Sequence, residues 1–231
     1  MKNIAIILAG GTGSRVGENC PKQFIQICGR SVIERSVDAF ERCDMIDEIA
    51  VVIHPLWIDK MNEIVNANGW TKLRKVVCGG NVRAMSSVAA IKMYRNEGEC
   101  NMIFHDAARP LVSERIIRDV VEALEKYEAV GVASPVTDTI FVAEKGMVTS
   151  VPDRSKLFRA QTPQAFRLSV IDRAYVIALS DEHFKSTDDC GTVLRYLPET
   201  EIHLVDGEER NMKVTFREDI EIAERWLANE R

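Results

Sequence analysis

Ile4-Ala5-Ile6-Ile7-Leu8-Ala9, followed by Gly10-Gly11-Thr12-Gly13-Ser14-Arg15, is the stretch from which the architecture of the chain can be inferred. Consecutive apolar residues predict a strand buried on both faces, which is typical of a parallel sheet. The glycines predict a turn at the carboxyl end of that strand, where open α/β sheets bind ligands. Because glycine has no Cβ, backbone N–H groups of such a turn can approach phosphate oxygens closely.

Apolar runs and helical patterns alternate up to about residue 136, which predicts a doubly wound, Rossmann-like, mostly parallel α/β sheet. The Ser31/Glu34 capping-box pattern predicts a helix start, and Ser113 predicts another. Further buried strands are expected at 49–53, 75–78, 101–105 and 130–136, with a helix carrying Ala84, Val88 and Ile91 between the second and third of these.

Residues 139–151 break this alternation. They predict two short strands around Glu144-Lys145-Gly146, with too few apolar residues to build a core of their own. We therefore expect a projecting β-arm at about 137–156 within a single domain spanning 1–231. Helices at about 168–178, 188–196 and 218–227, with a strand at 201–205, complete the prediction.

Composition excludes several classes of protein. Apolar residues make up 46% and charged residues 28%, with a formal net charge of −5, so the chain can bury a core and is not basic like a general nucleic-acid binder. None of the six cysteines forms a C-x-x-C pair or lies at zinc-ligand spacing to a histidine. No segment approaches the ~20 apolar residues of a membrane span. We expect a cytoplasmic protein with reduced thiols that binds neither nucleic acid nor membrane.

Two common phosphate-binding motifs do not fit the glycine-rich loop. A P-loop string G-x-x-x-x-G-K-[ST] is absent. Gly11 and Gly13 begin a dinucleotide fingerprint, but Val16 occupies the third glycine position. Pro21-Lys22-Gln23-Phe24 follows instead, and its lysine could reach the phosphates that the loop would bind.

The loop followed by P-K-Q resembles the nucleotidyltransferase family that forms CDP-alditols, which includes the 2-C-methyl-D-erythritol 4-phosphate and ribitol-5-phosphate cytidylyltransferases. Four further motifs support the resemblance, in the family's order and across nearly the whole chain. They are Gly79-Gly80-Asn81-Val82-Arg83 with Ser86, His105-Asp106-Ala107-Ala108-Arg109-Pro110, Gln161-Thr162-Pro163-Gln164-Ala165-Phe166, and Asn211-Met212-Lys213-Val214-Thr215.

The resemblance implies a homodimer whose projecting arm completes the partner's site, and it implies roles for individual residues. CTP would be bound by Ala9, Gly10, Gly11, Gly13, Gly80, Asn81, Arg83 and Ser86. The alditol phosphate would be bound by Asp106, Ala107, Arg109, Thr139 and Thr162. The catalytic cations would be Arg15, Lys22, Arg154 and Lys213.

The chemistry requires those cations. An oxygen of the alditol phosphate attacks the α-phosphorus of CTP, and pyrophosphate leaves. A phosphate monoester has a second pKa near ~6, so its oxygen is already ionised and no general base is needed. Cations must instead screen the repulsion between two anions. Mg²⁺ bridging the phosphates is expected, with Asp106 as its candidate protein ligand, whereas His105 is interpreted as structural.

The acceptor stays open between two alditols. The short gap from Arg15 to Lys22 and the H-D-A-A-R-P form are similar to enzymes of isoprenoid precursor synthesis that act on 2-C-methyl-D-erythritol 4-phosphate, which we favour. The L-A-G-G-T-G opening, Q-T-P-Q-A-F and Cys190 are similar to ribitol 5-phosphate enzymes of teichoic-acid and capsule synthesis. A CTP-binding regulator without activity is a further alternative, against which Arg15, Lys22 and Lys213 argue.

Overall fold

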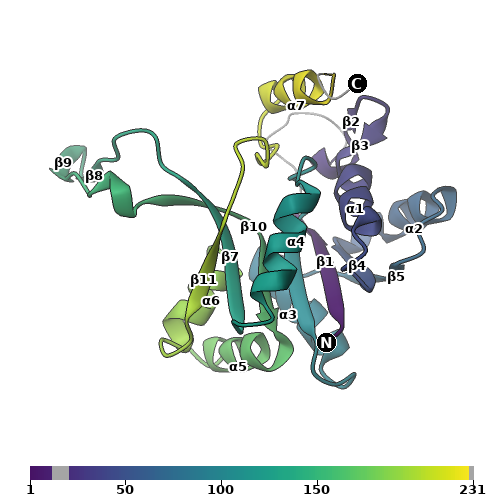
Figure 1. The fold of residues 1–231 in the computed structure, drawn as a ribbon, viewed down its shortest axis with the longest axis horizontal. Helices are drawn as coiled ribbons and strands as arrows, with labels where there is room; N and C mark the ends of the chain where they lie inside the picture. The colour runs from purple at the N-terminus through teal and green to yellow at the C-terminus, as the bar shows by residue number, and fades with distance from the viewer. Residues whose placement is uncertain (12–20, 229–231) are drawn as a thin grey trace.

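The chain folds around a central sheet, as the computed structural model shows for the residues it describes, 1–11 and 21–228 (Figure 1). In that part of the chain the sheet has seven strands in the order β11-β7-β10-β6-β1-β4-β5. Strand β10 runs antiparallel to β6 and β7, and the other neighbouring strands pair in parallel. The bounds are β1 Asn3–Ala9, β4 Glu48–Ile53, β5 Leu73–Cys78, β6 Asn101–Asp106, β7 Ala129–Pro135, β10 Phe158–Arg167 and β11 Ile202–Asp206. The predicted mostly parallel α/β sheet is confirmed.

Helices cover both faces of this sheet, and β1 shows why. Its side chains alternate, so Ala5 and Ile7 pack in one core cluster and Ile4 and Ile6 in the other. The first cluster is closed by α1 (Val32–Arg42), α2 (Ile58–Ala67) and α4 (Glu114–Ala123). The second is closed by α3 (Arg83–Tyr94), α5 (Leu168–Ala178) and α6 (Asp189–Tyr196).

The predicted helix starts are confirmed atom by atom. The Ser31 side chain accepts a hydrogen bond from the Glu34 backbone N–H, and the Glu34 carboxylate accepts one from the Ser31 backbone N–H, which completes the capping box. The Ser113 side chain caps α4 by accepting from the Ile116 N–H. Two N-cap oxygens thus fix where the helices on the first face begin.

The predicted hairpin is present and extends away from the body of the molecule (Figure 1). Strands β8 (Val142–Glu144) and β9 (Met147–Ser150) pair antiparallel, and all of their residues are exposed. Lys145 and Gly146 join them with φ of 49° and 82°, the left-handed conformation that suits a tight two-residue turn. The short 3₁₀ helix η3 (Arg154–Lys156) follows as the chain returns.

The C-terminal helix packs against the N-terminal part of the chain. Ala223 of α7 (Glu218–Ala228) lies in a small buried cluster with Ile27, Val32 and Val214. The short hairpin of β2 (Gln26–Ile27) and β3 (Arg30–Ser31) supplies part of this cluster, next to the 3₁₀ helix η1 (Lys22–Phe24). This packing carries the segment around Val214 to the start of the chain.

Several elements were not predicted from the sequence. Strand β10 contains Pro163 and an irregularity between Gln161 and Gln164, and proline in a central strand argues against a strand. Helix α2 with η2 (Pro55–Trp57), and the two-residue strands β2 and β3, are too short or too polar to give a clear periodic signal.

Two expectations from composition bear on the described residues. The cysteines found there, Cys28, Cys43, Cys78, Cys100 and Cys190, all carry free thiols, as expected. Across residues 1–11 and 21–228, no helix has the length and apolar character needed to span a bilayer.

Candidate active site

The candidate site lies at the edge of the sheet where the parallel strands end. Strands β1, β4, β5 and β6 run in the same direction, so their last residues, from Ala9 to Asp106, share one rim. The loops that follow carry Gly10-Gly11, Gly79-Gly80 and the segment from Asp106 to Arg109. Three of the sequence motifs therefore meet where open α/β sheets bind ligands.

Two glycine loops and one serine pack together at this rim. A Cβ added to Gly10 would lie 2.7 Å from the Ser86 Oγ, and one added to Gly79 would lie 2.9 Å from the same atom. A Cβ on Gly80 would overlap the Cβ of Met85. Met85 leaves no room for a side chain at Gly80, whereas a Cβ at Gly10 would displace the Ser86 hydroxyl, which α3 brings between the loops.

Gln23 fixes the beginning of the first glycine loop. Its buried side-chain amide donates to the Ala9 carbonyl at 3.2 Å and to the Gly11 carbonyl at 3.4 Å. The P-K-Q segment is thereby attached to the loop, which places Lys22 beside it. Gly13 and Arg15, predicted for CTP and catalysis, lie outside the described residues.

Asp106, the last residue of β6, lies between two cations. Its Oδ1 accepts from Arg83 Nε at 3.1 Å, and its Oδ2 accepts from Lys213 Nζ at 2.7 Å. Burial would raise the pKa of this carboxyl, but the charges of Arg83 and Lys213 outweigh it and hold the pKa well below its usual range. The carboxylate is therefore ionised and orients both cations.

Lys22 contacts the segment that carries Lys213, although 191 positions separate the two lysines. Lys22 Nζ donates to the carbonyl of Val214 at 3.2 Å, so its ammonium lies beside the segment that carries Lys213. The packing of α7 on the N-terminal hairpin produces this proximity. The contact brings a cation from the N-terminal part of the chain to the C-terminal segment that carries Lys213.

His105 is part of the scaffold beneath the rim. It is fully buried, its Nδ1 lies 3.1 Å from Thr162 Oγ1, and its Nε2 lies 3.1 Å from the Arg109 carbonyl. The Arg109 carbonyl can only accept, so the ring proton is on Nε2 and Nδ1 accepts from the Thr162 hydroxyl, whose oxygen also accepts from the Asp106 N–H at 3.0 Å. Burial lowers the pKa of His105 to about 4, which keeps the ring neutral. Both its nitrogens are occupied, which agrees with a structural role.

Arg109 presents a half-buried positive charge, and no carboxylate among the described residues forms an ion pair with it. Its Nη1 donates to the Asn211 carbonyl at 2.6 Å and its Nη2 to the Ala160 carbonyl at 3.3 Å. Burial lowers the pKa of this guanidinium, and no side-chain acceptor among the described residues is bonded to its Nε. A guanidinium held by carbonyls keeps its charge for an incoming anion.

Comparison with known proteins fits this geometry. The family model described as 2-C-methyl-D-erythritol 4-phosphate cytidylyltransferase (IspD) matches residues 3–229. The chain belongs to this family. The IspD-family match makes the chain a nucleotidyltransferase of the cytidylyltransferase type, as predicted.

Individual relatives and solved structures agree with this family assignment. The chain is 42% identical over 229 residues to the 2-C-methyl-D-erythritol 4-phosphate cytidylyltransferase of Thermobifida fusca, covering 96% of the chain and 92% of that protein. A crystal structure of 4-diphosphocytidyl-2C-methyl-D-erythritol synthase from Anaerococcus prevotii matches with a TM-score of 0.86 and 33% identity, covering 98% of this chain and 96% of that one.

A relative of the second predicted type is also present. The bifunctional ribulose 5-phosphate reductase/CDP-ribitol pyrophosphorylase of Haemophilus influenzae is 38% identical over 227 residues, which cover 97% of this chain and 48% of that protein. Both alditol classes weighed from the sequence are thus represented among the relatives.

The other predicted residues of this IspD-family chain fall into three groups. Ala107 is buried and its N–H donates to the Leu8 carbonyl, so it contributes backbone to the rim. Asn81 is exposed on the loop before α3. Thr139 and Arg154 are exposed on the arm, where Arg154 Nη1 donates to the Thr137 carbonyl at 2.8 Å, so the structure does not bring them to the rim of their own chain.

Sequence reasoning missed two residues that support the rim. Asp189 is fully buried and accepts from Arg83 Nη1 at 2.8 Å, and Tyr175 donates to Asp189 at 2.6 Å. Asp189 follows a helix cap, Asp188, and such a position is normally solvated. Tyr175 lies among ordinary core positions of α5, so the sequence contains no signal for this contact.

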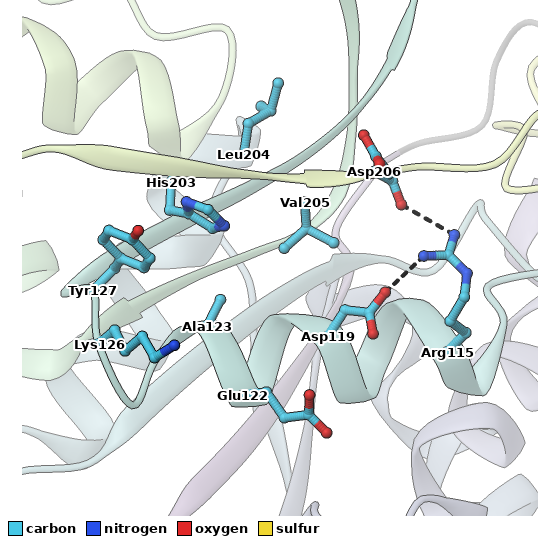
Figure 2. Close-up of a pocket in the computed structure, with 10 residues that line it drawn as sticks. All are labelled: Arg115, Asp119, Glu122, Ala123, Lys126, Tyr127, His203, Leu204, Val205 and Asp206. Atoms are coloured by element: carbon cyan, nitrogen blue, oxygen red, sulfur yellow. Dashed lines mark hydrogen bonds and ion pairs between the residues drawn. The ribbon is translucent and has the colours of Figure 1, made fainter.

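A separate hollow of about 420 Å³ lies at the outer edge of the sheet, between α4 and β11 (Figure 2). Figure 2 shows Arg115 between Asp119 and Asp206, and its guanidinium already has partners: it donates to the Asp119 carboxylate at 2.6 Å and to the Asp206 backbone carbonyl at 3.1 Å. None of the predicted site residues lines it. This hollow is therefore no candidate for the phosphoryl transfer.

Proposed function

We propose that the chain transfers CMP from CTP to 2-C-methyl-D-erythritol 4-phosphate and releases pyrophosphate. The observation that carries the proposal is the chain of charges at the rim, in which Asp106 joins Arg83 to Lys213 while Lys22 lies beside Val214. Three cationic side chains beside the Gly10 and Gly80 loops provide positive charge that screens the repulsion between the two approaching phosphates.

The reaction balances without a general base. An ionised oxygen of the acceptor phosphate bonds to the α-phosphorus of CTP as the bond from that phosphorus to the β-phosphate bridging oxygen breaks. Pyrophosphate carries the electron pair away. His105 has no part in proton transfer because both of its nitrogens are hydrogen-bonded inside the protein.

Mg²⁺ fits this site as an ion carried by the nucleotide. Among the described residues, no group of three His, Cys, Asp or Glu side chains could form a protein cage for a metal. Mg²⁺ usually keeps several waters and binds substrate phosphates with one or two carboxylates. Asp106 would supply such a carboxylate, since each of its oxygens retains a lone pair beyond its bond to a cation. When bound, the ion would neutralise charge developing on the phosphates.

Turnover measured with each acceptor tests the function. Purified protein is incubated with CTP, Mg²⁺ and either 2-C-methyl-D-erythritol 4-phosphate or ribitol 5-phosphate, and pyrophosphate is quantified. We expect the first acceptor to give the higher kcat/KM. A higher kcat/KM with ribitol 5-phosphate would show that the proposed acceptor is wrong, and it would be consistent with the name of the Haemophilus relative, a CDP-ribitol pyrophosphorylase. No turnover with either acceptor would refute the proposal.

Lys22→Ala gives this assay an internal control. Removal of a cation from the rim is expected to lower kcat by about 10²- to 10³-fold while the fold is retained, since Lys22 is not a core residue. Circular dichroism and thermal unfolding check the fold. Wild-type turnover in this variant would remove Lys22 from the mechanism.

We further propose a homodimer in the cytoplasm, joined through the arm. Apolar side chains of the arm are exposed with no cover in a single chain: Phe141 by 61%, Met147 by 71% and Val148 by 56%. A partner that covers them would also place Thr139 and Arg154 near its own rim.

Size-exclusion chromatography with light scattering is expected to give a dimer for the wild type and a monomer for Phe141→Ser/Met147→Ser. Leu56→Ser, which alters an apolar residue exposed by 80% outside the arm, is the matched control and should stay dimeric.

A further inference from the structure

Arg83 is held from two sides, although only one of its partners belongs to the predicted site. Its Nε donates to Asp106 at 3.1 Å and its Nη1 donates to Asp189 at 2.8 Å. Burial lowers the pKa of Arg83, but the two carboxylates outweigh this and raise it, so the guanidinium is always charged. A planar fork with two anchored nitrogens has its direction fixed.

The third nitrogen of that fork, Nη2, is bonded to none of the residues that the structure describes. Arg83 Nη2 is buried and has no hydrogen-bond partner among the residues that the structure describes. A buried charged donor without a partner is unfavourable, so it is usually explained by a ligand or water that the protein binds. Since Arg83 lies next to Asp106 at the rim, a phosphate or hydroxyl oxygen of a substrate is the acceptor that suits it.

Asp189 is itself fixed by three elements. Tyr175 of α5 donates its hydroxyl to Asp189 Oδ1 at 2.6 Å, while Oδ2 receives the bond from Arg83. Gln164 of β10 accepts from the Asp189 N–H at 3.0 Å and donates to Asp188 at 2.8 Å, which secures the first turn of α6. Asp189 has no solvent exposure, so its position can change only if this packing changes.

We propose that Asp189 is a positioning residue for the CMP transfer: it orients Arg83, and through Arg83 it aligns Asp106 and the Lys213 ammonium with the reacting phosphates. The proposal rests on the function proposed above. The path is continuous from Tyr175 through Asp189, Arg83 and Asp106 to Lys213, with each contact between 2.6 and 3.1 Å. It couples α5 and α6, on one face of the sheet, to the rim.

A second cluster of the same composition offers matched control variants. Tyr94 donates to the buried Glu48 at 2.5 Å, and Glu48 binds Lys2 at 2.5 Å. Glu48 is the first residue of β4, so this cluster lies at the opposite edge of the sheet from the rim. Its loss should reduce stability without changing the reaction.

The experiment compares Asp189→Asn and Tyr175→Phe with Glu48→Gln and Tyr94→Phe. For each variant, kcat is measured with CTP, Mg²⁺ and the acceptor that the wild type uses, the Kd of CTP alone by calorimetry, and unfolding by circular dichroism. We expect Asp189→Asn to lower kcat by about 10- to 100-fold through misalignment. The Kd of CTP should rise by a smaller factor than kcat falls, because among the described residues predicted to bind CTP, Arg83 is held by Asp189 whereas Gly10, Gly80 and Ser86 are not.

The controls decide between positioning and general stability. Glu48→Gln and Tyr94→Phe should lose thermal stability and keep wild-type kcat. Wild-type kcat in folded Asp189→Asn overturns the proposal, as does a loss of CTP binding equal to the loss of kcat, or an equal loss of kcat in Glu48→Gln. If Asp189→Asn does not fold, Tyr175→Phe decides, since it removes one hydroxyl: lowered kcat supports the proposal and wild-type kcat overturns it. Wild type that turns over neither acceptor would refute the proposed function instead.

Discussion

The amino ends and the carboxyl ends of the parallel strands, here called the amino edge and the carboxyl edge, each contain a buried carboxylate bonded to a tyrosine hydroxyl and a cation. The two clusters differ in what lies beyond the cation. At the amino edge, Tyr94, Glu48 and Lys2 form a cluster whose lysine side chain is 46% exposed. At the carboxyl edge, Tyr175 and Asp189 bind Arg83, whose side chain is 23% exposed and continues to Asp106. The same local chemistry ends in solvent at one edge and in the candidate site at the other.

The direction of the strands explains the difference. Parallel strands β1, β4, β5 and β6 deliver their loops to one edge, and those loops carry the glycines and Asp106. The amino edge receives the returns from the helices and the carboxyl end of the antiparallel strand β10, at Arg167. A buried ion pair is by itself weak evidence for stability. Because ligands bind at the carboxyl ends of the strands, the end at which such a pair lies indicates whether it acts in the reaction.

The largest expected contrast comes from removing one cation at each edge. Lys213→Ala leaves Asp106 without its 2.7 Å ammonium partner and should lower kcat by about 10²- to 10³-fold. Lys2→Ala removes the half-exposed partner of the buried Glu48, which keeps Tyr94 and Lys75, so it should lower the free energy of unfolding by about 1 to 3 kcal/mol and leave kcat unchanged. Steady-state kinetics and urea unfolding measure both. Equal losses of kcat in the two variants would abolish the distinction between the edges.

The second largest contrast is expected in how the free energy of unfolding depends on pH in the acid range. Burial lowers the pKa of His105 from 6.5 to about 4, so between these values the unfolded state binds the proton and the folded state does not. Stability from the neutral ring is therefore complete above pH 6.5 and lost as the pH falls toward 4, by about 3 kcal/mol.

His105→Gln should flatten the dependence of unfolding free energy on pH between 7 and 4. The pKa of Glu48 is lowered because Lys2 and Tyr94 outweigh the effect of burial. Its ionised carboxylate therefore loses its contribution to the free energy of unfolding only at lower pH. Glu48→Gln should therefore leave the slope between pH 7 and 5 unchanged. Urea unfolding at each pH gives the slopes, and a wild-type slope in His105→Gln would contradict the burial argument.

The smallest effect compares a glycine from each edge. Gly10→Ala would place a Cβ 2.7 Å from Ser86 Oγ, so the serine must rotate away, and the Kd of CTP should rise about tenfold, or about 1.4 kcal/mol. Gly98 precedes β6 at the amino edge with a φ of +91°, so Gly98→Ala should destabilise the fold by about 1 kcal/mol without altering CTP binding. Calorimetry with CTP distinguishes the two, and unchanged affinity in Gly10→Ala would remove the close approach from the nucleotide site.

Much of the fold could be predicted because its signals are local. The apolar run before Gly10, the Ser31 capping box and the Lys145-Gly146 turn each act over a few residues, and the structure confirms all three. Strand β10 could not be predicted, because Pro163 cannot donate to a sheet and the strand is accommodated only by an irregularity in its pairing.

The candidate site was predicted unevenly for the same reason. Motif residues such as Gly80, Ser86 and Asp106 lie together as expected, and Lys213 was placed near them through the resemblance. The hydroxyl of Thr162, predicted to touch substrate, is bonded to His105 and the Asp106 N–H, a use that its motif did not reveal.

By itself the sequence determined the alternation of strands and helices, the arm, the family and the types of charged residue at the site, because periodicity, caps and motifs are properties of neighbouring residues. Only the tertiary structure decided that Lys22 meets Val214 and that Asp189 supports Arg83. These contacts join positions more than a hundred residues apart, and the packing of α6 and α7 against the rest of the chain brings them together.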